Sequence, residues 1–413
     1  MKLKLIAIAK DEAAYIPEWV FHHVAVGFDS ISIYTNELLD NTSAVIDKIS
    51  LHYPVSEINS DHIKASSGSD FQRVVYGIAY QKAVLEGFTH VMFLDIDEFW
   101  TVCNFDLNIK EYLSNKTGMA HYSFPWGLKS GEEQFSSPFQ EVNTFVMNRH
   151  VKTIINTKAN IDEVHIHNVV SSNAKSILPD GSTLSEEGKY VFALKHELDT
   201  IPDAFILHRI SRSQKEYISL LGRGRPGQVD SRLRLKDNRD GYLPRKNSHL
   251  KLSIKKSNID SYTKKYNAFL KRCSLGPEIE KGRKFVMGRY KEVKRLITED
   301  KQVDILLKEK LLKNISLPEL TEAINDVNDL SADLFPVELS EKETIKFRKA
   351  VGANSRFIDS LRDLSLKYQN QDLDLSVRLM KLANIFRPEG PFIKVSLQRL
   401  IAEHRKLKKN RDF

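Results

Sequence analysis

The sequence predicts an α/β protein with a mostly parallel sheet in its N-terminal part, followed by an α-helical C-terminal region. Within residues 1–100, short apolar runs alternate with longer segments that have the apolar spacing of amphipathic helices. Such alternation is typical of a parallel sheet covered by helices on both faces. Toward the C-terminus the spacing is helical throughout, which predicts a separate helical region.

Each N-terminal element follows from a local signal. Strands are expected at residues 3–9, 30–35, 54–58 and 90–95, and helices at residues 12–27, 41–53 and 69–87, in alternating order. Gly27 and Gly87 are the expected stops of the first and third helices, and Asn41 or Thr42 is the expected cap of the second. Further strands are expected at 119–128, 144–157 and 189–198. Residues 204–227 predict a strand, then a helix, then a loop rich in Gly and Arg.

The expected domain organisation has three parts. Residues 1–240 form the α/β domain, residues 241–340 a basic helical segment and residues 341–413 a helical module. Helices are expected at 355–369, 372–386 and 391–407, with Gly390-Pro391 as the break before the last. Their spacing of small and large apolar residues resembles one tetratricopeptide-like hairpin, which predicts a helical cap or docking module.

Composition and charge narrow the class of protein. The chain has 413 residues, of which 41% are hydrophobic and 28% charged, and only two cysteines. These values exclude a disordered chain and a disulfide framework, and no apolar run is long enough for a membrane span. We therefore expect a cytoplasmic protein. Between residues 245 and 295, 16 Lys or Arg face 4 Asp or Glu. This excess predicts either a solvated helical face or contact with an anionic partner, such as the inner face of the membrane.

The segment THVMFLDIDEFW, residues 89–100, carries the strongest chemical signal. Its apolar run, residues 91–94, ends in Asp95, Asp97 and Glu98. In an open α/β sheet, ligands bind beyond the carboxyl ends of the strands. Carboxylate oxygens at such an end suit Mg²⁺ or Mn²⁺ shared with substrate phosphates. The cluster therefore predicts a platform for a metal ion and a diphosphate, against the alternative of a surface turn with unpaired acids.

Four segments together resemble a known family. They are IAIAKDEAAYIPEWVFHHVAVGFDSISIYTNELLDNT, FQRVVYGIAYQKA, FLDIDEF and ILHRISRSQKEYISLLGRGRP. Over residues 1–235 the chain resembles nucleotide-sugar-dependent glycosyltransferases of the GT-A fold, close to family 2 and the family 92-like group of bacterial surface-glycan type. It departs from them at two places. Lys10-Asp11-Glu12 replaces the usual Lys-Asn-Glu, and His208-Arg209 replaces a common His-Tyr.

The resemblance implies a nucleotide site at the ends of the first strands. The residues implied to border the nucleoside, base or ribose are Lys10, Asp11, Glu12, Asn36, Asp40, Gln72, Arg73 and Tyr76. Asp97 is the first implied metal ligand, Asp95 contacts the ribose or a metal-bound water, and Glu98 orients either one. The implied cofactor is Mn²⁺ or Mg²⁺.

A third metal ligand is often a late histidine in this fold. His208 follows an apolar run and is the first candidate, as a ligand or diphosphate contact. His165 and His167 are rivals, because residues i and i+2 share one face of a strand. Their alternative role is structural hydrogen bonding. Arg223 and Arg225, in GRGRPG, are expected to close over the diphosphate as a lid, or else to belong to a basic linker turn.

The implied reaction is transfer of a hexose, with UDP-hexose as the donor class, to a glycan or other hydroxyl acceptor in surface polysaccharide synthesis. Inversion is the usual outcome among the relatives, and it requires a carboxylate base. The segment FPWGLKSGEEQF offers Glu132 or Glu133 as that base. Trp126 either stacks on a sugar face or belongs to the core.

Two other classes remain. A sugar nucleotidyltransferase shares a related sheet, but the loop AKDEAAY lacks the glycines typical of that class. A non-catalytic scaffold would use the C-terminal helices, and the presence of Asp95, Asp97 and His208 argues against it. Nucleic-acid binding is not expected, because the basic segment matches no known module.

Overall fold

The chain forms two compact units in the computed structural model. The structure describes all residues except 104, 106–107, 115, 117, 130, 185–192, 225–234, 237, 243–248, 300–304, 321–322, 324–354, 388–389 and 410–413. The first unit comprises Met1–Asn238 and Tyr242–Lys294, and the second comprises Arg239–Gly241 and Arg295–Phe413. Most of the basic segment that the sequence set apart from residues 1–240 thus packs as part of the first unit.

The first half of the sheet in the first unit is parallel. In chain order its elements are β1 (Leu3–Ala9), α1 (Ile16–Ala25), β2 (Ser30–Thr35), α2 (Thr42–Ser50), β3 (Val55–Asn59), α3 (Asp61–Ser67), the short 3-10 helix η1 (Gly68–Asp70), α4 (Phe71–Leu85) and β4 (His90–Phe93). The strands pair in the order β3-β2-β1-β4, all parallel. Every element expected in this region is present, and α3 is an addition that its short polar sequence did not reveal.

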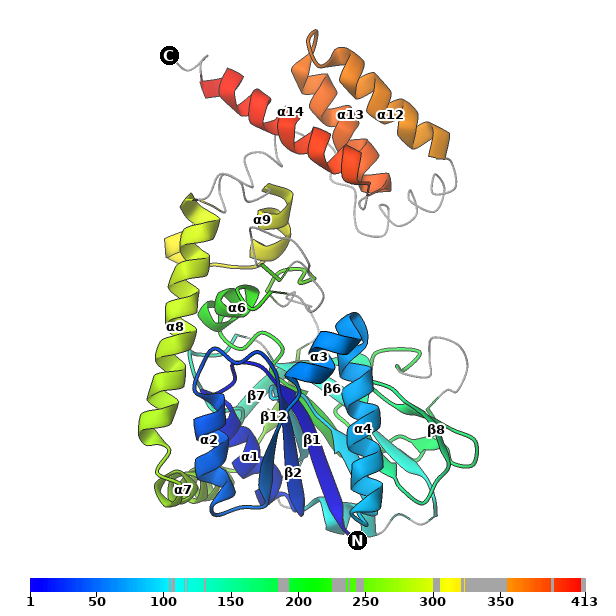
Figure 1. Cartoon of the computed structure of the whole chain (residues 1–413), viewed down its shortest axis with the longest axis vertical. Coiled ribbons are helices and arrows are strands. Elements are labelled where there is room, and N and C mark those ends of the chain that lie inside the picture. Colours follow the sequence, from blue (N-terminus) through cyan, green and yellow to red (C-terminus); the bar gives the residue numbers. More distant parts are fainter. Residues whose placement is uncertain are drawn as a thin grey trace. The chain divides into compact units, whose positions relative to one another are not determined.

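The strands are buried because helices cover both faces of the sheet. Leu3, Leu5 and Ala7 pack into one core cluster with the buried residues of α1 and α2. Ile6, between them, packs into a second cluster with the buried residues of α4. Successive strand side chains point to opposite faces, so one strand supplies both cores. Figure 1 shows α1 and α2 on one side of β1 and β2 and α4 on the other.

The second half of the sheet is mixed. It contains β5 (Glu98–Val102), β6 (His121–Lys129), β7 (Val142–Asn156), β10 (Ser176–Ile177), β11 (Ala204–His208) and β12 (Leu250–Ser253), with α5 (Ile109–Ser114) and α6 (Gln214–Leu221) outside it. The strand order continues β4-β7-β6-β11-β5, with β10 on β6 and β12 on β7. A separate two-stranded sheet pairs β8 (Ile161–Val164) with β9 (Val169–Ser171). Among the described strands of the large sheet, five of nine pairings are parallel.

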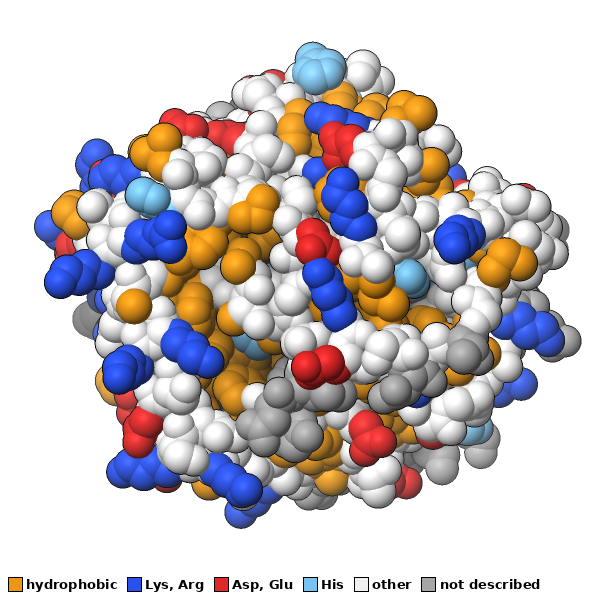
Figure 2. All heavy atoms as spheres, turned by 90° about the horizontal axis from the view of Figure 1, so that it is seen from below, with side chains coloured by type: hydrophobic (Ala, Val, Ile, Leu, Met, Phe, Trp, Pro, Cys, Tyr) orange, Lys and Arg blue, Asp and Glu red, His pale blue; other side chains and the backbone are white. Residues whose placement is uncertain are grey.

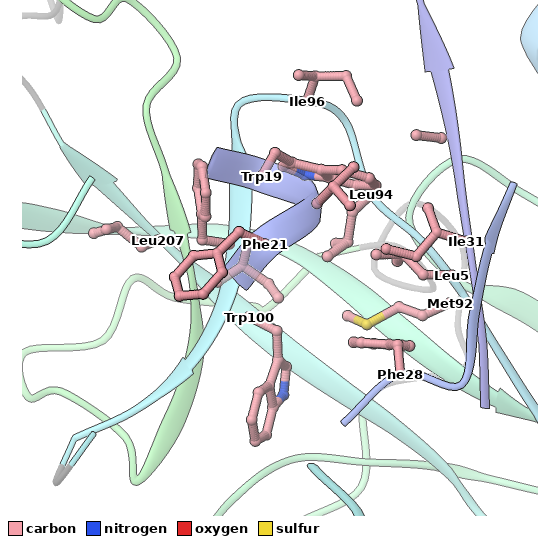
Figure 3. Packing of buried hydrophobic residues seen from close by; sticks show 14 of the residues in the cluster. Leu5, Trp19, Phe21, Phe28, Ile31, Met92, Leu94, Ile96, Trp100 and Leu207 are labelled. Carbon is pink, nitrogen blue, oxygen red and sulfur yellow. The ribbon is translucent and has the colours of Figure 1, made fainter. Parts of the chain in front are cut away.

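The open edge of the sheet, at β5, is closed by side chains of α1. Trp19 Nε1 donates to the Glu98 carbonyl at 2.9 Å, and His22 Nε2 donates to the Trp100 carbonyl at 2.8 Å. His23 Nε2 accepts from the Trp100 N–H at 3.4 Å. Three side chains of one helix therefore satisfy backbone groups that a further strand would otherwise bind. Figure 3 shows Trp19 and Phe21 packed near Trp100 in this part of the core.

The C-terminal part is helical, as expected. In the first unit, α7 (Lys256–Arg272) is followed by α8 (Gly276–Glu299), within which the boundary between the units falls. The second unit contains α9 (Ile305–Leu312), the short 3-10 helix η3 (Pro318–Leu320), α12 (Ser355–Tyr368), α13 (Leu373–Phe386) and α14 (Pro391–Lys409). The last three helices share a core that includes Val377, Met380 and Leu397. None of the described helices is both long and apolar enough to cross a membrane.

The predicted fold class is confirmed: a Rossmann-like α/β sheet, mostly parallel, is followed by a helical region. The strand expected at 189–198 falls partly outside the described residues, and its described part contributes one isolated bridge between Ala193 and His150. The helix expected at 12–27 begins at Ile16, because the backbone turns first: both Tyr15 and Ile16 donate to the Glu12 carbonyl. Asp11 within that turn has a φ of 53°, which no helix residue adopts.

Candidate active site

The acidic segment lies in a tight turn between β4 and β5. The N–H of Glu98 donates to the Asp95 carbonyl at 3.0 Å, and the Glu98 side chain accepts from the Asp95 N–H at 2.9 Å. The strand expected to run through Asp95 therefore ends at Phe93. After the turn the chain re-enters the sheet as β5, which pairs antiparallel with β11. The turn stands at the carboxyl end of a parallel strand, as the sequence predicted.

A buried lysine neutralises two of the three carboxylates. Lys152, on β7, lies 3.2 Å from Asp95 Oδ2 and 3.1 Å from Glu98 Oε2. The side chains of Lys152 and Glu98 are 1% and 0% exposed, whereas that of Asp95 is 37% exposed. Burial raises the pKa of Glu98 to about 7. Burial alone lowers the pKa of Lys152, but the charges of Asp95 and Glu98 outweigh it and raise that pKa. Asp95 and Glu98 are thus held by a cation.

Asp97 meets His208, as the sequence predicted for two residues of one site. His208 ends β11, which pairs with β5 so that His208 stands opposite Glu98. Its Nε2 lies 3.6 Å from Asp97 Oδ1, and its Nδ1 lies 3.9 Å from Glu98 Oε1. Burial lowers the pKa of His208, but the Asp97 carboxylate outweighs burial and raises it. The imidazole therefore stands between two carboxylates, with a ring nitrogen toward each.

The separation of Asp97 and His208 fits a shared divalent ion. The 3.6 Å between Asp97 Oδ1 and His208 Nε2 exceeds a hydrogen bond. Two donors bound at about 2.1 Å to one ion lie roughly 3.0 to 3.6 Å apart. The far nitrogen of a metal-binding histidine commonly faces a carboxylate, the position that Glu98 Oε1 has here. Among the described residues, no group of three or more His, Cys, Asp or Glu side chains is arranged to hold a metal by itself.

Trp126 is buried among histidines. Its ring centroid lies 4.3 Å from that of His208, 5.0 Å from that of His150 and 5.2 Å from that of His167. Trp126 is 9% exposed and its indole stacks on His150. In this structure it is therefore a buried residue that forms part of the wall of the site. The strand pattern of the sequence did not predict that His150 and His167 lie near His208, around the same indole.

His165 and His167 do not share the face of a strand, contrary to expectation. β8 ends at Val164, so both lie in the loop that follows it. His165 faces Glu163 at 3.2 Å, while His167 Nδ1 donates to the Val151 carbonyl at 3.2 Å. Burial lowers the pKa of His167 to about 3, so its ring is neutral. The hydrogen-bonded structural alternative therefore describes His167.

The loop after β1 is built from internal ion pairs. Asp11 pairs with Arg289 at 2.9 Å and also accepts from the Leu39 N–H at 2.7 Å. Glu12 pairs with Arg223 at 2.5 Å and with Arg212 at 3.1 Å. Lys10 pairs with Glu37 at 2.7 Å. The structure thus joins two residues predicted for the site, Glu12 and Arg223, but each neutralises the other.

Arg225, the second predicted lid residue, lies outside the described residues. Asn36 is buried at the end of β2, beside the same loop. Asp40 stabilises that loop, because its carboxylate accepts from the Ala13 and Thr42 N–H groups, both at 2.9 Å. Asp40 therefore has a structural role, two hydrogen bonds to backbone N–H groups, that does not require a nucleotide.

The three residues predicted on α4 divide into different environments. Tyr76 is fully buried and stacks on Phe93 with ring centroids 4.2 Å apart. Gln72 donates to the Tyr76 hydroxyl at 3.0 Å. Arg73 is exposed and lies 3.2 Å from Glu163. Tyr76 is therefore part of the core under the acidic turn, and Arg73 contacts the β8 strand.

Glu132 and Glu133, the two predicted bases, differ sharply. Both Glu132 oxygens accept from Arg209 Nε, at 2.9 and 3.0 Å, and Lys129 lies 3.5 Å away. The Glu132 side chain is 1% exposed. Glu133, in contrast, is exposed. A buried carboxylate held by a guanidinium is poorly placed to take a proton from an acceptor hydroxyl, and Glu133 has no such obstacle.

Sequence reasoning missed the cations of the site. Lys152, Arg209, Arg212 and Arg289 pair with carboxylates that were predicted to bind the nucleotide, to orient the metal site or to act as the base. A weak signal existed for Lys152, which is followed by the short apolar pair Ile154-Ile155 and is the one Lys, Arg, Asp or Glu in the last seven residues of the strand. No signal existed for Arg289, since it lies 278 positions from Asp11 along the chain.

Comparisons with known proteins place little constraint on this site. No protein-family model matches the chain, and no curated protein matches it significantly. Its structure is similar to mannose-1-phosphate geranyltransferase from Thermus thermophilus, with 11% identity and a TM-score of 0.21 over 38% of this chain and 50% of that one. It is also similar to S. aureus TarS, with 14% identity and a TM-score of 0.24 over 94% of this chain and 55% of that one.

A shorter form, TarS 1–349 in complex with UDP, matches with 14% identity and a TM-score of 0.24, over 98% of this chain and 92% of that one. The chain spans about half the length of the geranyltransferase and TarS structures, at 50% and 55%. At such low TM-scores and identities, these likenesses carry no argument about the family or activity of this chain.

Proposed function

We propose that the chain is a metal-dependent glycosyltransferase that moves a sugar from a nucleotide-diphosphate donor, of the UDP-hexose class, to a hydroxyl acceptor. The observation that carries the proposal is the meeting of Asp97 and His208 at the carboxyl end of β4. Their oxygen and nitrogen, 3.6 Å apart, are donors that suit Mn²⁺ or Mg²⁺. Diphosphate oxygens and water would complete the coordination.

The bound ion would act as a Lewis acid that neutralises charge on the leaving diphosphate. The residues of the chain account for the remaining needs. Asp97 and His208 would hold the ion that binds the diphosphate end of the donor, and Lys152 fixes the turn that carries Asp97 through Asp95 and Glu98. Asp95, at 37% exposed, remains accessible to the ribose.

The acceptor oxygen attacks the anomeric carbon while the bond from that carbon to the diphosphate oxygen breaks. The attack comes from the face opposite the diphosphate, which gives inversion, and the hydroxyl proton passes to a carboxylate on that face. We assign this role to Glu133 rather than Glu132, because Arg209 engages both oxygens of Glu132. The acceptor class is a glycan of surface polysaccharide.

Asp97→Ala is expected to reduce metal-dependent hydrolysis of the preferred nucleotide sugar by about 100-fold or more, since a lost charge contact in a transition state costs several kcal/mol. The measurement is release of the nucleoside diphosphate from a panel of nucleotide sugars with and without Mn²⁺. Asp47→Ala, an exposed acid on α2, is the matched control and keeps full activity.

Three outcomes of that screen would contradict the proposal. Equal turnover by wild type and Asp97→Ala would remove Asp97 from the chemistry. Release of pyrophosphate from a nucleoside triphosphate and a sugar phosphate would indicate a nucleotidyltransferase. Absence of both turnover and metal-dependent thermal stabilisation with every donor would indicate a non-catalytic scaffold.

We further propose that α7 lies against the anionic inner face of a membrane. The helix buries Tyr262 and Phe269, and its exposed residues include Lys256, Lys264, Lys265, Lys271 and Arg272 with Asp260 as the one acid. Of these basic residues, Lys256, Lys264 and Lys271 fall on the side of the helix opposite its buried side chains, while Lys265 and Arg272 flank the buried side. Figure 2 shows Lys and Arg side chains bordering hydrophobic ones on the left of the lower face, where α7 lies in Figure 1.

Reversal of three of these charges, in Lys256→Glu, Lys264→Glu and Lys271→Glu combined, is expected to weaken binding to phosphatidylglycerol vesicles by about 100-fold, at about 1 kcal/mol per charge. Co-sedimentation with those vesicles and with neutral phosphatidylcholine vesicles measures this. The control triple Lys158→Glu, Lys175→Glu and Lys195→Glu changes the net charge equally at exposed sites elsewhere. Equal loss in both triples would show a net-charge effect and no docking face.

A further inference from the structure

A cavity lies at the far end of β5 from the acidic turn. It has a volume of about 240 Å³ and is enclosed by the end of α1, the end of β5 and the first half of α7. Glu98, the first residue of β5, belongs to the Asp95 network, whereas Thr101 and Val102 line the cavity. Trp100 lines the cavity as well, so two to four residues of strand separate the two, or roughly 7 to 13 Å. The cavity is therefore a different place from the proposed donor site.

Four of the thirteen residues that line the cavity are aromatic. Phe21, Trp100, Phe105 and Tyr262 all line it. The Tyr262 ring lies 5.1 Å from that of Phe21 and 5.6 Å from that of Phe105, both measured between centroids. Rings that brace one another in this way form a fixed apolar surface, on which a planar group can pack without first ordering the wall.

The polar groups of the cavity favour an anion. Lys265 lines the cavity and is exposed, and no carboxylate among the described residues forms an ion pair with it. Asn258 and Ser261, on the same helix, add hydrogen-bonding groups beside it. No Asp or Glu lines the cavity. An anionic substituent would gain the lysine charge without meeting an opposing carboxylate.

Three lining residues also carry buried polar atoms that have no protein partner within the described structure. They are His22 Nδ1, Trp100 Nε1 and the Tyr262 hydroxyl. The residues are 1%, 0% and 9% exposed. Because His22 Nε2 donates to the Trp100 carbonyl, Nδ1 of the neutral ring is an acceptor. These atoms have almost no accessible surface, so they lie in the wall behind the cavity and are not contacts for a ligand.

We infer that this cavity is a second binding site, for a small organic anion with one planar apolar ring. Its 240 Å³ is below the roughly 300 Å³ at which pockets for drug-sized ligands begin, so one ring with a short substituent is the size that it admits. The ring packs against the surface that Phe21 and Tyr262 form together, and the anionic group lies at the mouth beside Lys265. The inference does not depend on the proposed transferase activity.

Three probes that share a benzene ring and differ in charge test this inference on the full chain. They are benzoate, benzyl alcohol and benzylamine, titrated with detection by saturation-transfer NMR and calorimetry. We expect benzoate to bind with a Kd of about 1 mM and the other two more weakly. Binding of no probe would leave water as the occupant and overturn the inference, and a preference for benzylamine would overturn the anion class.

Variants locate the binding. Lys265→Gln is expected to weaken benzoate about 10-fold or more, as for a lost hydrogen bond to a charged group, and to leave benzyl alcohol unchanged. Lys264→Gln, the neighbouring exposed lysine that does not line the cavity, is the matched control and retains benzoate affinity. Ala25→Trp, which places an indole at the exposed rim of the cavity, is expected to abolish binding of all three probes. Unchanged benzoate binding in both Lys265→Gln and Ala25→Trp would place the probe elsewhere.

Discussion

Lys152→Met is expected to destabilise the first unit by about 3 to 5 kcal/mol, the usual cost of removing one partner from a buried ion pair. Lys152 is 1% exposed and is the cation next to both Glu98, at 3.1 Å, and Asp95, at 3.2 Å. Methionine keeps the approximate length of the side chain, so the loss of stability reflects the missing charge more than an empty cavity. Glu98, which is fully buried, would then have to take up a proton or remain an unpaired charge.

Urea unfolding followed by tryptophan fluorescence measures this effect. All three tryptophans, Trp19, Trp100 and Trp126, lie in the first unit, so the signal reports that unit alone. Adding Glu98→Gln to Lys152→Met should restore about 1 kcal/mol or more, because the two residues are coupled. Lys110→Met, which breaks the half-exposed pair with Asp29, is the control and should cost less than about 1 kcal/mol. A loss below that value for Lys152→Met would contradict the buried-network account.

Acid is expected to destabilise the first unit through His22 and His23. Both rings are buried and hydrogen-bonded to backbone, and burial lowers the pKa of His22 to about 4 and that of His23 well below its ordinary value. In the unfolded chain the pKa returns to about 6.5. Below pH 6.5 the unfolded state therefore binds a proton that the folded state refuses. Stability is complete above pH 6.5 and falls as the pH drops toward 4.

For His22 alone the full loss, which is reached below pH 4, amounts to about 3.4 kcal/mol, at about 1.36 kcal/mol per pKa unit of difference between the two states. Urea unfolding at pH 7.5, 6.0 and 5.0 gives the slope. His22→Gln keeps a donor for the Trp100 carbonyl. It should reduce the pH slope of the unfolding free energy by the amount that corresponds to nearly one proton. His62→Gln, at an exposed position, should leave it unchanged. An identical pH slope in wild type and His22→Gln would show that His22 does not remain neutral in the folded state.

The parallel half of the sheet could be predicted from the sequence because its signals are local. A strand buried on both faces has a continuous apolar run, as in residues 3–9, and each helix has its own spacing and stop. β5 escaped prediction because its five residues follow the acidic turn and pair only with β11, about a hundred positions later. The acidic turn itself was visible, since carboxylates after an apolar run are a local signal.

The partners of the site residues could not be predicted. Nothing near Glu12 in the sequence indicates that Arg212 and Arg223 neutralise it, and nothing near Glu132 indicates Arg209. Ion pairing depends on how distant strands and loops come together, and a periodic pattern contains no information on that. The sequence therefore predicted ligand-binding roles for these acids without the cations that pair with them. The meeting of Asp97 and His208 could be anticipated because both follow predicted strands.

The three hydrogen bonds between α1 and β5 also fix the position of the helix along the strand. Trp19 reaches Glu98, and His22 and His23 reach Trp100, so the helix can neither slide nor rotate along the strand without losing all three bonds. The turn at Asp11 and Glu12 leads directly into this helix, and the acidic turn leads directly into this strand. Two loops that are far apart in the sequence are thereby held in fixed alignment by a helix that contributes no residue to the acidic turn.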